Sequence, residues 1–374
     1  MEKKSKIIRY FKYLNKKRRD FFRIRRLKSL DISAKKNLKN THPVKRILLF
    51  STSKGWGDSL FVLGFLKELT LNGFLVHMIV PTCYMDHYRY PQVEELVNSF
   101  ESRDCAERIF KFSPDLVIDL DYVGIDFYEK KIEILKRLSC PKLTVNQYYK
   151  DLNVITSFIS IKNEKHISER YALILREALD IRVPKIYPVA YFSDKDDEWA
   201  KYFLQKCKKN IFVYINSVAG DSDRCLSKEQ LESIINMVLE RIDCAVIYNS
   251  KSPIVFKNHS DVVYPLPEVT FSKLSALLSK VDFVITPDTS VTHIASAFNI
   301  KSFVIFPPND RDFWQYYSAA EAWSGLSDIT HSFYIDDIGL KIDDLGYSNR
   351  KTGKNYLYSV KQLNMELAKI LDKL

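Results

Sequence analysis

The sequence has few cysteines and no long apolar run. Its six cysteines, Cys83, Cys105, Cys140, Cys207, Cys225 and Cys244, are scattered and include no CxxC pair. This pattern predicts reduced thiols rather than a disulfide framework or a zinc site. No stretch approaches the roughly 20 apolar residues that a membrane-spanning helix needs. The basic N-terminus also has no apolar core of the kind that a secretory signal requires, so we expect a cytoplasmic protein.

Positive charge is concentrated at one end of the chain. The 374 residues have a formal net charge of +11, but residues 1–46 alone hold 18 Lys or Arg and 3 acidic residues. The other 328 residues hold 39 basic and 43 acidic residues and are slightly acidic. A chain of this length has room for two domains with separate cores. We therefore treat residues 1–43 as a basic N-terminal extension of a two-domain body.

The basic extension alternates cations with apolar residues. Ile7, Ile8, Phe11, Leu14, Phe21, Phe22 and Leu27 recur at roughly helical spacing among lysines and arginines. A basic amphipathic segment of this kind can bind an anionic membrane surface. It could instead be a solvated leader or an extra packed helix, or it could bind nucleic acid. We rank nucleic acid last because no zinc-finger spacing or RNA-binding motif accompanies the basic run.

From Val44 onward, strand and helix patterns alternate in two series of about 150 residues each. This alternation predicts parallel sheets with helices on both faces. We expect one doubly wound domain over residues 44–190, a second over 191–355, and a final amphipathic helix over 356–374. We could assign no role to residues 308–355. Ligands of such domains bind outside the carboxyl ends of the strands, so the cleft between the domains is the expected site.

The loop "STSKGWGDSL" (51–60) follows the first predicted strand. Gly55 and Gly57 allow a tight turn and a close approach of backbone to ligand. Asp58 is placed either to cap the next helix or to act as a general base toward a sugar hydroxyl. The loop lacks the GK[ST] ending of a P-loop. We take Lys54, Gly55 and Gly57 as acceptor-loop candidates and Asp58 as the candidate base.

The stretch "FVITPDTSVTHIASAF" (283–298) reads as a strand followed directly by a helix. Backbone N–H groups and the helix dipole at such an N-terminus favour a phosphate, and the hydroxyls of Thr289 and Ser290 add donors. Asp288 either caps the helix or binds a sugar hydroxyl. His293 lies one turn into the helix, where it either packs or reaches the same ligand.

Two further polar features allow more than one interpretation. Arg224, in the loop "SVAGDSDRCLSKEQL" (217–231), either neutralises a phosphate or is a surface residue. Asp119 and Asp121 have the spacing of a DxD metal motif, but they end an apparent buried strand. We interpreted them as strand-end polarity.

Several of these stretches resemble glycosyltransferase family 9, the lipopolysaccharide heptosyltransferases. The segment 282–306 looks like the family signature, and "RILLFSTSKGWGDSLFVLGFLKEL" (46–69) is similar to its first strand, GD pair and first helix. "HISERYALILREALDI" (166–181) resembles the helix that ends its first domain, and the loop at Asp223 and Arg224 matches a phosphate-binding loop. The chain departs from the pattern at Ser290, where glycine is usual, and at Arg224, where lysine is usual.

The resemblance implies a GT-B fold, with two Rossmann-like domains facing across a cleft. It implies an inverting, metal-independent transfer of heptose from ADP-heptose to a lipopolysaccharide or lipooligosaccharide core acceptor. Asp58 matches the catalytic base of the family, and Asp288, Thr289, Ser290, His293 and Arg224 match its donor-binding positions. No cofactor beyond the nucleotide-sugar substrate is implied. A lipid-linked acceptor would place the enzyme at the inner face of the inner membrane, held there by residues 1–40.

Three alternatives remain open on the sequence. A transferase of the same fold could use another donor, such as a UDP-hexose, because the departures cluster on the donor side. A non-catalytic protein could bind glycans or a membrane surface, although an intact Asp58 argues against it. A nucleic-acid binder would depend on residues 1–40 and would lose affinity steeply with added salt.

Overall fold

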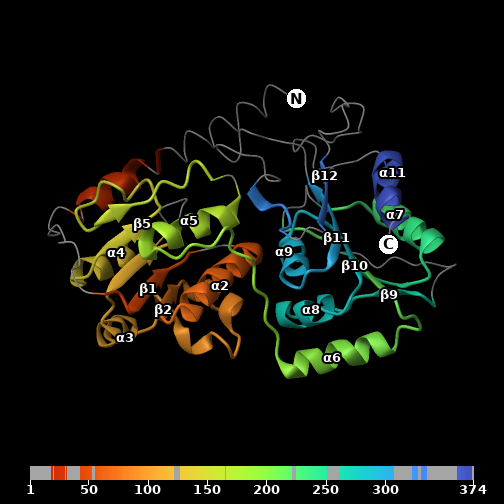
Figure 1. The fold of residues 1–374 in the computed structure, drawn as a ribbon, viewed down its shortest axis with the longest axis horizontal. Helices are drawn as coiled ribbons and strands as arrows, with labels where there is room; N and C mark the ends of the chain where they lie inside the picture. Colours follow the sequence, from red (N-terminus) through yellow and green to blue (C-terminus); the bar gives the residue numbers. More distant parts are fainter. Residues whose placement is uncertain are drawn as a thin grey trace. The chain divides into compact units, whose positions relative to one another are not determined.

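The computed structural model describes residues 18–19, 21–29, 31, 43–52, 55–121, 127–164, 166–220, 225–250, 261–306, 322–326, 330–334 and 360–372. The chain divides into two compact units (Figure 1). Unit 1 comprises Met1–Glu164 and Ser168–Ile186, and unit 2 comprises Lys165–Ile167 and Tyr187–Leu374. The division after residue 186 lies four residues before the expected boundary. The backbone N–H of Ile186 donates to Ser168 O at 3.2 Å, which ties the segment after the last helix of unit 1 to that helix.

Unit 1 is built on a six-stranded parallel sheet. The strands are β1 (Arg46–Phe50), β2 (Leu75–Val80), β3 (Val97–Ser99), β4 (Leu116–Asp119), β5 (Lys142–Thr144) and β6 (Ser157–Phe158). Their order is β3-β2-β1-β4-β5-β6. The helices are α2 (Trp56–Leu71), α3 (Cys105–Phe112), α4 (Tyr128–Arg137) and α5 (Ile167–Leu179), with 3-10 turns η1 (Thr82–Tyr88) and η2 (Glu94–Leu96).

Unit 2 repeats this plan. Its strands are β7 (Phe212–Asn216), β8 (Ala245–Asn249), β9 (Val263–Pro265), β10 (Phe283–Pro287), β11 (Lys301–Phe306) and β12 (Thr330–Tyr334). They form a parallel sheet in the order β12-β11-β10-β7-β8-β9. The helices are α6 (Asp194–Gln205), α7 (Lys228–Arg241), α8 (Phe271–Leu278), α9 (Ser290–Ala297) and α11 (Val360–Leu371). Capping boxes at Ser193 and Ser227 begin α6 and α7.

Numbered within its own unit, each sheet has the strand order 3-2-1-4-5-6. This is the order of the Rossmann fold, which binds ligands where the strand order reverses, outside the carboxyl ends of the two central strands. The reversal lies between β1 and β4 in unit 1 and between β7 and β10 in unit 2. We call these two places the first and second switch points. The α/β fold with two doubly wound domains is therefore confirmed.

The helices near the two ends of the chain each pack within their own unit. Residues 21–29 are helical, and Leu27 is fully buried in the core of unit 1. Asp31 is also buried, and its carboxylate accepts the backbone N–H groups of Asn153 and Val154. At the other end, α11 packs on α7 through Leu367 and Leu371 (Figure 1). The C-terminal helix therefore belongs to unit 2, and the extension includes a packed helix.

Among the described residues, no helix is long and apolar enough to span a bilayer.

Candidate functional site

The predicted acceptor loop follows β1 at the first switch point. Helix α2 begins at Trp56, with Gly55 in the N-cap position, so Asp58 lies in the first turn and is not the N-cap residue. A carboxylate in the first turn is stabilised by the helix dipole. An added Cβ at Gly55 would lie 3.1 Å from Asp58 Oδ2, so the absence of a side chain at Gly55 leaves room for this carboxylate. Lys54 falls outside the described residues.

An aromatic group lies beside this loop. The Tyr88 side chain is buried, and burial raises the pKa of its hydroxyl, which the charges of Asp58 and Asp121 raise further. The ring of the neighbouring His87 lies 4.0 Å from that of Trp56, centroid to centroid, and burial lowers the His87 pKa to about 4. This histidine is neutral at physiological pH.

The DLD sequence at the end of β4 forms a buried ion-pair network. Lys131 Nζ, from the first turns of α4, lies 2.7 Å from Asp119 Oδ1 and 2.6 Å from Asp121 Oδ2. The side chains of Lys131 and Asp119 are buried, and that of Asp121 is 9% exposed. The ammonium group occupies the position between the two carboxylates that a metal ion would need. The interpretation as strand-end polarity therefore stands, with Lys131 as the partner.

A neutral network occupies the second switch point. Asn216 ends β7, and its Nδ2 donates to Thr286 Oγ1 at 3.1 Å and to Thr289 Oγ1 at 3.3 Å. The two threonine hydroxyls lie 3.1 Å apart, and Thr289 also caps α9 by accepting the N–H of Val291. The side chain of Asn216 therefore connects the ends of two adjacent strands to the N-terminus of α9.

The remaining residues predicted to bind the donor surround this N-terminus. Asp288 is buried, and its backbone N–H continues the sheet by donating to Ile305 O. Thr289 and Ser290 are half-buried. His293 is only 4% exposed, and its ring lies 5.9 Å from that of Trp323. Burial, with a smaller contribution from His166, lowers the His293 pKa to about 3, so a neutral imidazole packs behind the helix start.

The structure thus groups the predicted residues by unit. Gly55, Gly57 and Asp58 lie together at the first switch point. Asp288, Thr289, Ser290 and His293 lie together at the second. Arg224 falls outside the described residues, and its role stays a prediction, as do the roles of the other candidates.

Sequence reasoning missed Asn216, Tyr88 and Lys131. Asn216 had a recognisable signal, because it is a polar residue that ends the apolar strand "FVYIN". Tyr88 had none, because it lies in an irregular segment 30 positions beyond Asp58. Lys131 is one of several lysines in its helix, and only the fold shows which of them is buried.

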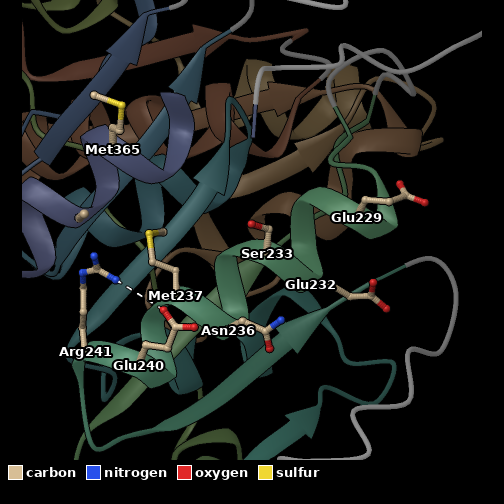
Figure 2. Close-up of a pocket in the computed structure, with 9 residues that line it drawn as sticks. Glu229, Glu232, Ser233, Asn236, Met237, Glu240, Arg241 and Met365 are labelled. Atoms are coloured by element: carbon tan, nitrogen blue, oxygen red, sulfur yellow. Dashed lines mark ion pairs between the residues drawn. The ribbon is translucent and has the colours of Figure 1, made fainter. Parts of the chain in front are cut away.

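Two other features do not contribute to the candidate site. No group of three or more His, Cys, Asp or Glu side chains suited to a metal ion occurs in the described part of the chain. A shallow groove lies where α11 meets α7, lined by Glu229, Glu232, Ser233, Asn236, Met237, Glu240, Arg241, Met365 and Ala368 (Figure 2). It contains none of the residues at either switch point.

Comparison with known proteins agrees with this geometry. The family model of glycosyltransferase family 9 (heptosyltransferase) matches residues 152–333, which include the whole second switch point. The match supports a glycosyltransferase. A search among curated proteins finds no significant match in sequence.

Solved structures of the family share the fold at low identity. A family 9 glycosyltransferase from Veillonella parvula aligns over 88% of this chain and 98% of its own, with a TM-score of 0.63 and 11% identity. ADP-heptose lps heptosyltransferase II from E. coli aligns over 88% and 99%, with a TM-score of 0.59 and 13% identity. E. coli heptosyltransferase WaaC with ADP aligns over 87% and 99%, with a TM-score of 0.56 and 13% identity. At these identities the likeness establishes the GT-B fold.

Proposed function

We propose that this glycosyltransferase moves a heptose from ADP-heptose to a lipopolysaccharide or lipooligosaccharide core acceptor, with inversion and without a metal ion or other cofactor. The observation that carries the proposal is the family match across the second switch point, together with an acidic residue at the first. Two of the structural neighbours named above are ADP-heptose enzymes or were solved with ADP. Those names suggest the donor for this chain.

In the proposed donor site, the N-terminus of α9 binds the nucleotide diphosphate. The backbone N–H groups of the first helical turn and the helix dipole favour an anion there. The network of Asn216, Thr286 and Thr289 holds the helix start in place. Arg224 is proposed to add positive charge. Such preorganised dipoles and cations stabilise the leaving diphosphate without a metal ion.

In the proposed transfer step, Asp58 takes the proton of an acceptor hydroxyl. The acceptor oxygen then forms a bond to the anomeric carbon of the donor sugar, from the face opposite the nucleotide. The bond between that carbon and the diphosphate oxygen breaks, and the diphosphate leaves with the electron pair. The product has the inverted anomeric configuration.

The test is a donor panel with two readouts. The purified protein is heated with ADP-heptose, with UDP-hexoses and with ADP alone, because a ligand that binds only the folded state raises the melting temperature. Transfer to a core oligosaccharide is then followed by mass spectrometry. We expect stabilisation and transfer with ADP-heptose. Stabilisation and transfer with a UDP-hexose would identify that sugar nucleotide as the donor in place of ADP-heptose. The absence of transfer with every donor would contradict the proposal.

We also propose that the basic extension holds the enzyme on an anionic membrane surface, where a lipid-linked acceptor resides. Within the helical residues 21–29, Phe21 is 61% and Phe22 53% exposed, while Leu27 anchors the helix in the core. Arg18, Arg19, Arg23 and Arg25 are exposed in the same stretch, and the Arg18 guanidinium lies 5.8 Å from the Phe22 ring. Aromatic rings among cations match the chemistry of the interface of an anionic bilayer.

Vesicle sedimentation tests this attachment. We expect the full chain to sediment with vesicles that contain phosphatidylglycerol and to stay in solution with vesicles of phosphatidylcholine alone. The double variant Phe21→Ser/Phe22→Ser should weaken sedimentation. A matched control replaces Tyr202, which is exposed on α6 of unit 2, by serine. Equal binding of all three proteins to anionic vesicles would contradict the role of the two rings.

A further inference from the structure

We infer that Asp121 and Lys131 are positioning residues that fix the start of the segment leading from β1 to the candidate base Asp58 in α2. The inference rests on the proposed function, because it assigns a task to residues beside the proposed base. Neither residue touches the reacting groups in this inference. Their role is to hold Thr52, just after β1, in one position.

Two short contacts in series connect α4 to this loop. Lys131 Nζ contacts Asp121 Oδ2 at 2.6 Å, and the other oxygen of the same carboxylate, Oδ1, accepts the backbone N–H of Thr52 at 2.6 Å. Thr52 is the second residue after β1 and lies six positions before Asp58. A hydrogen bond that a backbone N–H donates to a charged acceptor is stronger than one to a neutral acceptor.

The second acid, Asp119, also contacts Lys131. Asp119 Oδ1 lies 2.7 Å from the ammonium, and its Oδ2 accepts the Thr144 hydroxyl at 3.1 Å. The rings of Phe50 and Tyr149 lie 5.7 and 5.4 Å from Lys131 Nζ. Salt bridges, hydrogen bonds and aromatic faces thus fix the ammonium on several sides, and Asp121 is fixed in turn.

A second buried lysine in the same sheet shows that carboxylates are not required to bury an ammonium here. Lys142, the first residue of β5, is 1% exposed, and its Nζ donates to the carbonyls of Leu138 and Cys140 at 2.7 and 2.9 Å. Burying charge is costly even when the charges are paired, and well-packed apolar residues often serve stability equally well. Packing alone therefore does not account for Asp119 and Asp121 beside Lys131. The hydrogen bond that the Thr52 N–H donates to Asp121 gives this network a further role.

The first measurement needs no donor. Hydrogen–deuterium exchange of the segment 48–60 is followed by mass spectrometry in the wild type, Asp121→Ala, Asp121→Asn and Lys131→Arg. We expect exchange to quicken by about tenfold or more in Asp121→Ala, because the N–H of Thr52 loses a charged acceptor. Asp121→Asn keeps an acceptor oxygen and should be intermediate. Lys131→Arg keeps the positive charge. If Asp121→Ala fails to fold, the wild type is compared with Asp121→Asn and Lys131→Arg instead.

The second measurement separates positioning from stability. With ADP-heptose as donor, we expect kcat of Asp121→Ala to fall by about 10- to 100-fold, since a displacement of about 1 Å can cost that much. The donor KM should stay within about twofold, because the proposed donor site lies in unit 2. Lys142→Met is the matched control. It removes a buried lysine from the same sheet and should leave both the exchange of segment 48–60 and kcat unchanged.

Two outcomes would overturn the inference. One is wild-type exchange in segment 48–60 of Asp121→Ala. The other is faster exchange with an unchanged kcat. A wild-type protein that transfers no sugar from any donor would contradict the proposed function instead, and the exchange measurement would still decide whether Asp121 supports the loop.

Discussion

The two switch points have the same place in the fold but different chemistry. At the first, between β1 and β4, buried charges meet: one ammonium and two carboxylates. At the second, between β7 and β10, an asparagine and two threonines form a neutral network. The strand order therefore determines where ligands bind, and the residues at the strand ends determine which chemistry each place supports.

The largest expected effect comes from removing the charge of the candidate base. In Asp58→Asn the amide can no longer take a proton, so we expect kcat to fall by about 10²- to 10⁴-fold. The donor-induced rise in melting temperature should persist, because the proposed donor site lies in unit 2. Glu68→Gln, three turns further along α2, is the control and should retain full activity. Near-wild-type turnover of Asp58→Asn would show that another group is the base.

The next effect tests the charged network as a structural element. Lys131→Met leaves Asp119 and Asp121 without their cation, and breaking a buried ion pair in this way costs about 3–5 kcal/mol of unfolding free energy. Lys142→Met removes an ammonium that donates to two backbone carbonyls, and it should cost less. Urea unfolding followed by circular dichroism measures both. Equal losses in the two variants would mean that the acids contribute nothing beyond what carbonyl partners provide.

Acidification should change the contributions of the two switch points to folding stability with opposite signs. His293 has a folded pKa of about 3, below its ordinary value, so folded unit 2 binds fewer protons than the unfolded chain between pH 6.5 and 3. Its contribution to stability is present above pH 6.5 and is lost as the pH falls, by about 2 kcal/mol at pH 5. Burial raises the Asp119 pKa to about 6, with Lys131 opposing, so the folded state there gains protons between about pH 6 and 4 and is relatively stabilised.

Melting curves at pH 7 and pH 5 check these signs. Relative to the wild type, His293→Gln should lose less stability on acidification, and Asp119→Asn should lose more. The same sign for both variants would contradict the opposed titration. Comparing each variant with the wild type cancels the contributions of the other titrating groups, including His87.

The sequence predicted where the candidate residues lie in the fold better than it predicted their side-chain contacts. The run from Phe283 to Phe298 correctly predicted a strand that delivers Thr289 and Ser290 to a helix start, because apolar period and turn chemistry are local. The sequence did not predict that Lys131 pairs with Asp119, because that contact depends on which face of α4 meets the sheet. The strand β12 was missed, since it follows a long segment without a periodic pattern.

The smallest expected effect tests the neutral network at the second switch point. Asn216→Ala removes the amide that donates to Thr286 and Thr289, so we expect a loss of about 1–3 kcal/mol in unfolding free energy, less than for Lys131→Met. The start of α9 should become less well held, and the donor should raise the melting temperature less than in the wild type. Asn236→Ala, exposed on α7, is the matched control and should change neither quantity. If Asn216→Ala retained the full donor-induced shift, the network would serve folding alone, and the donor would depend on the backbone of α9 without support from β7.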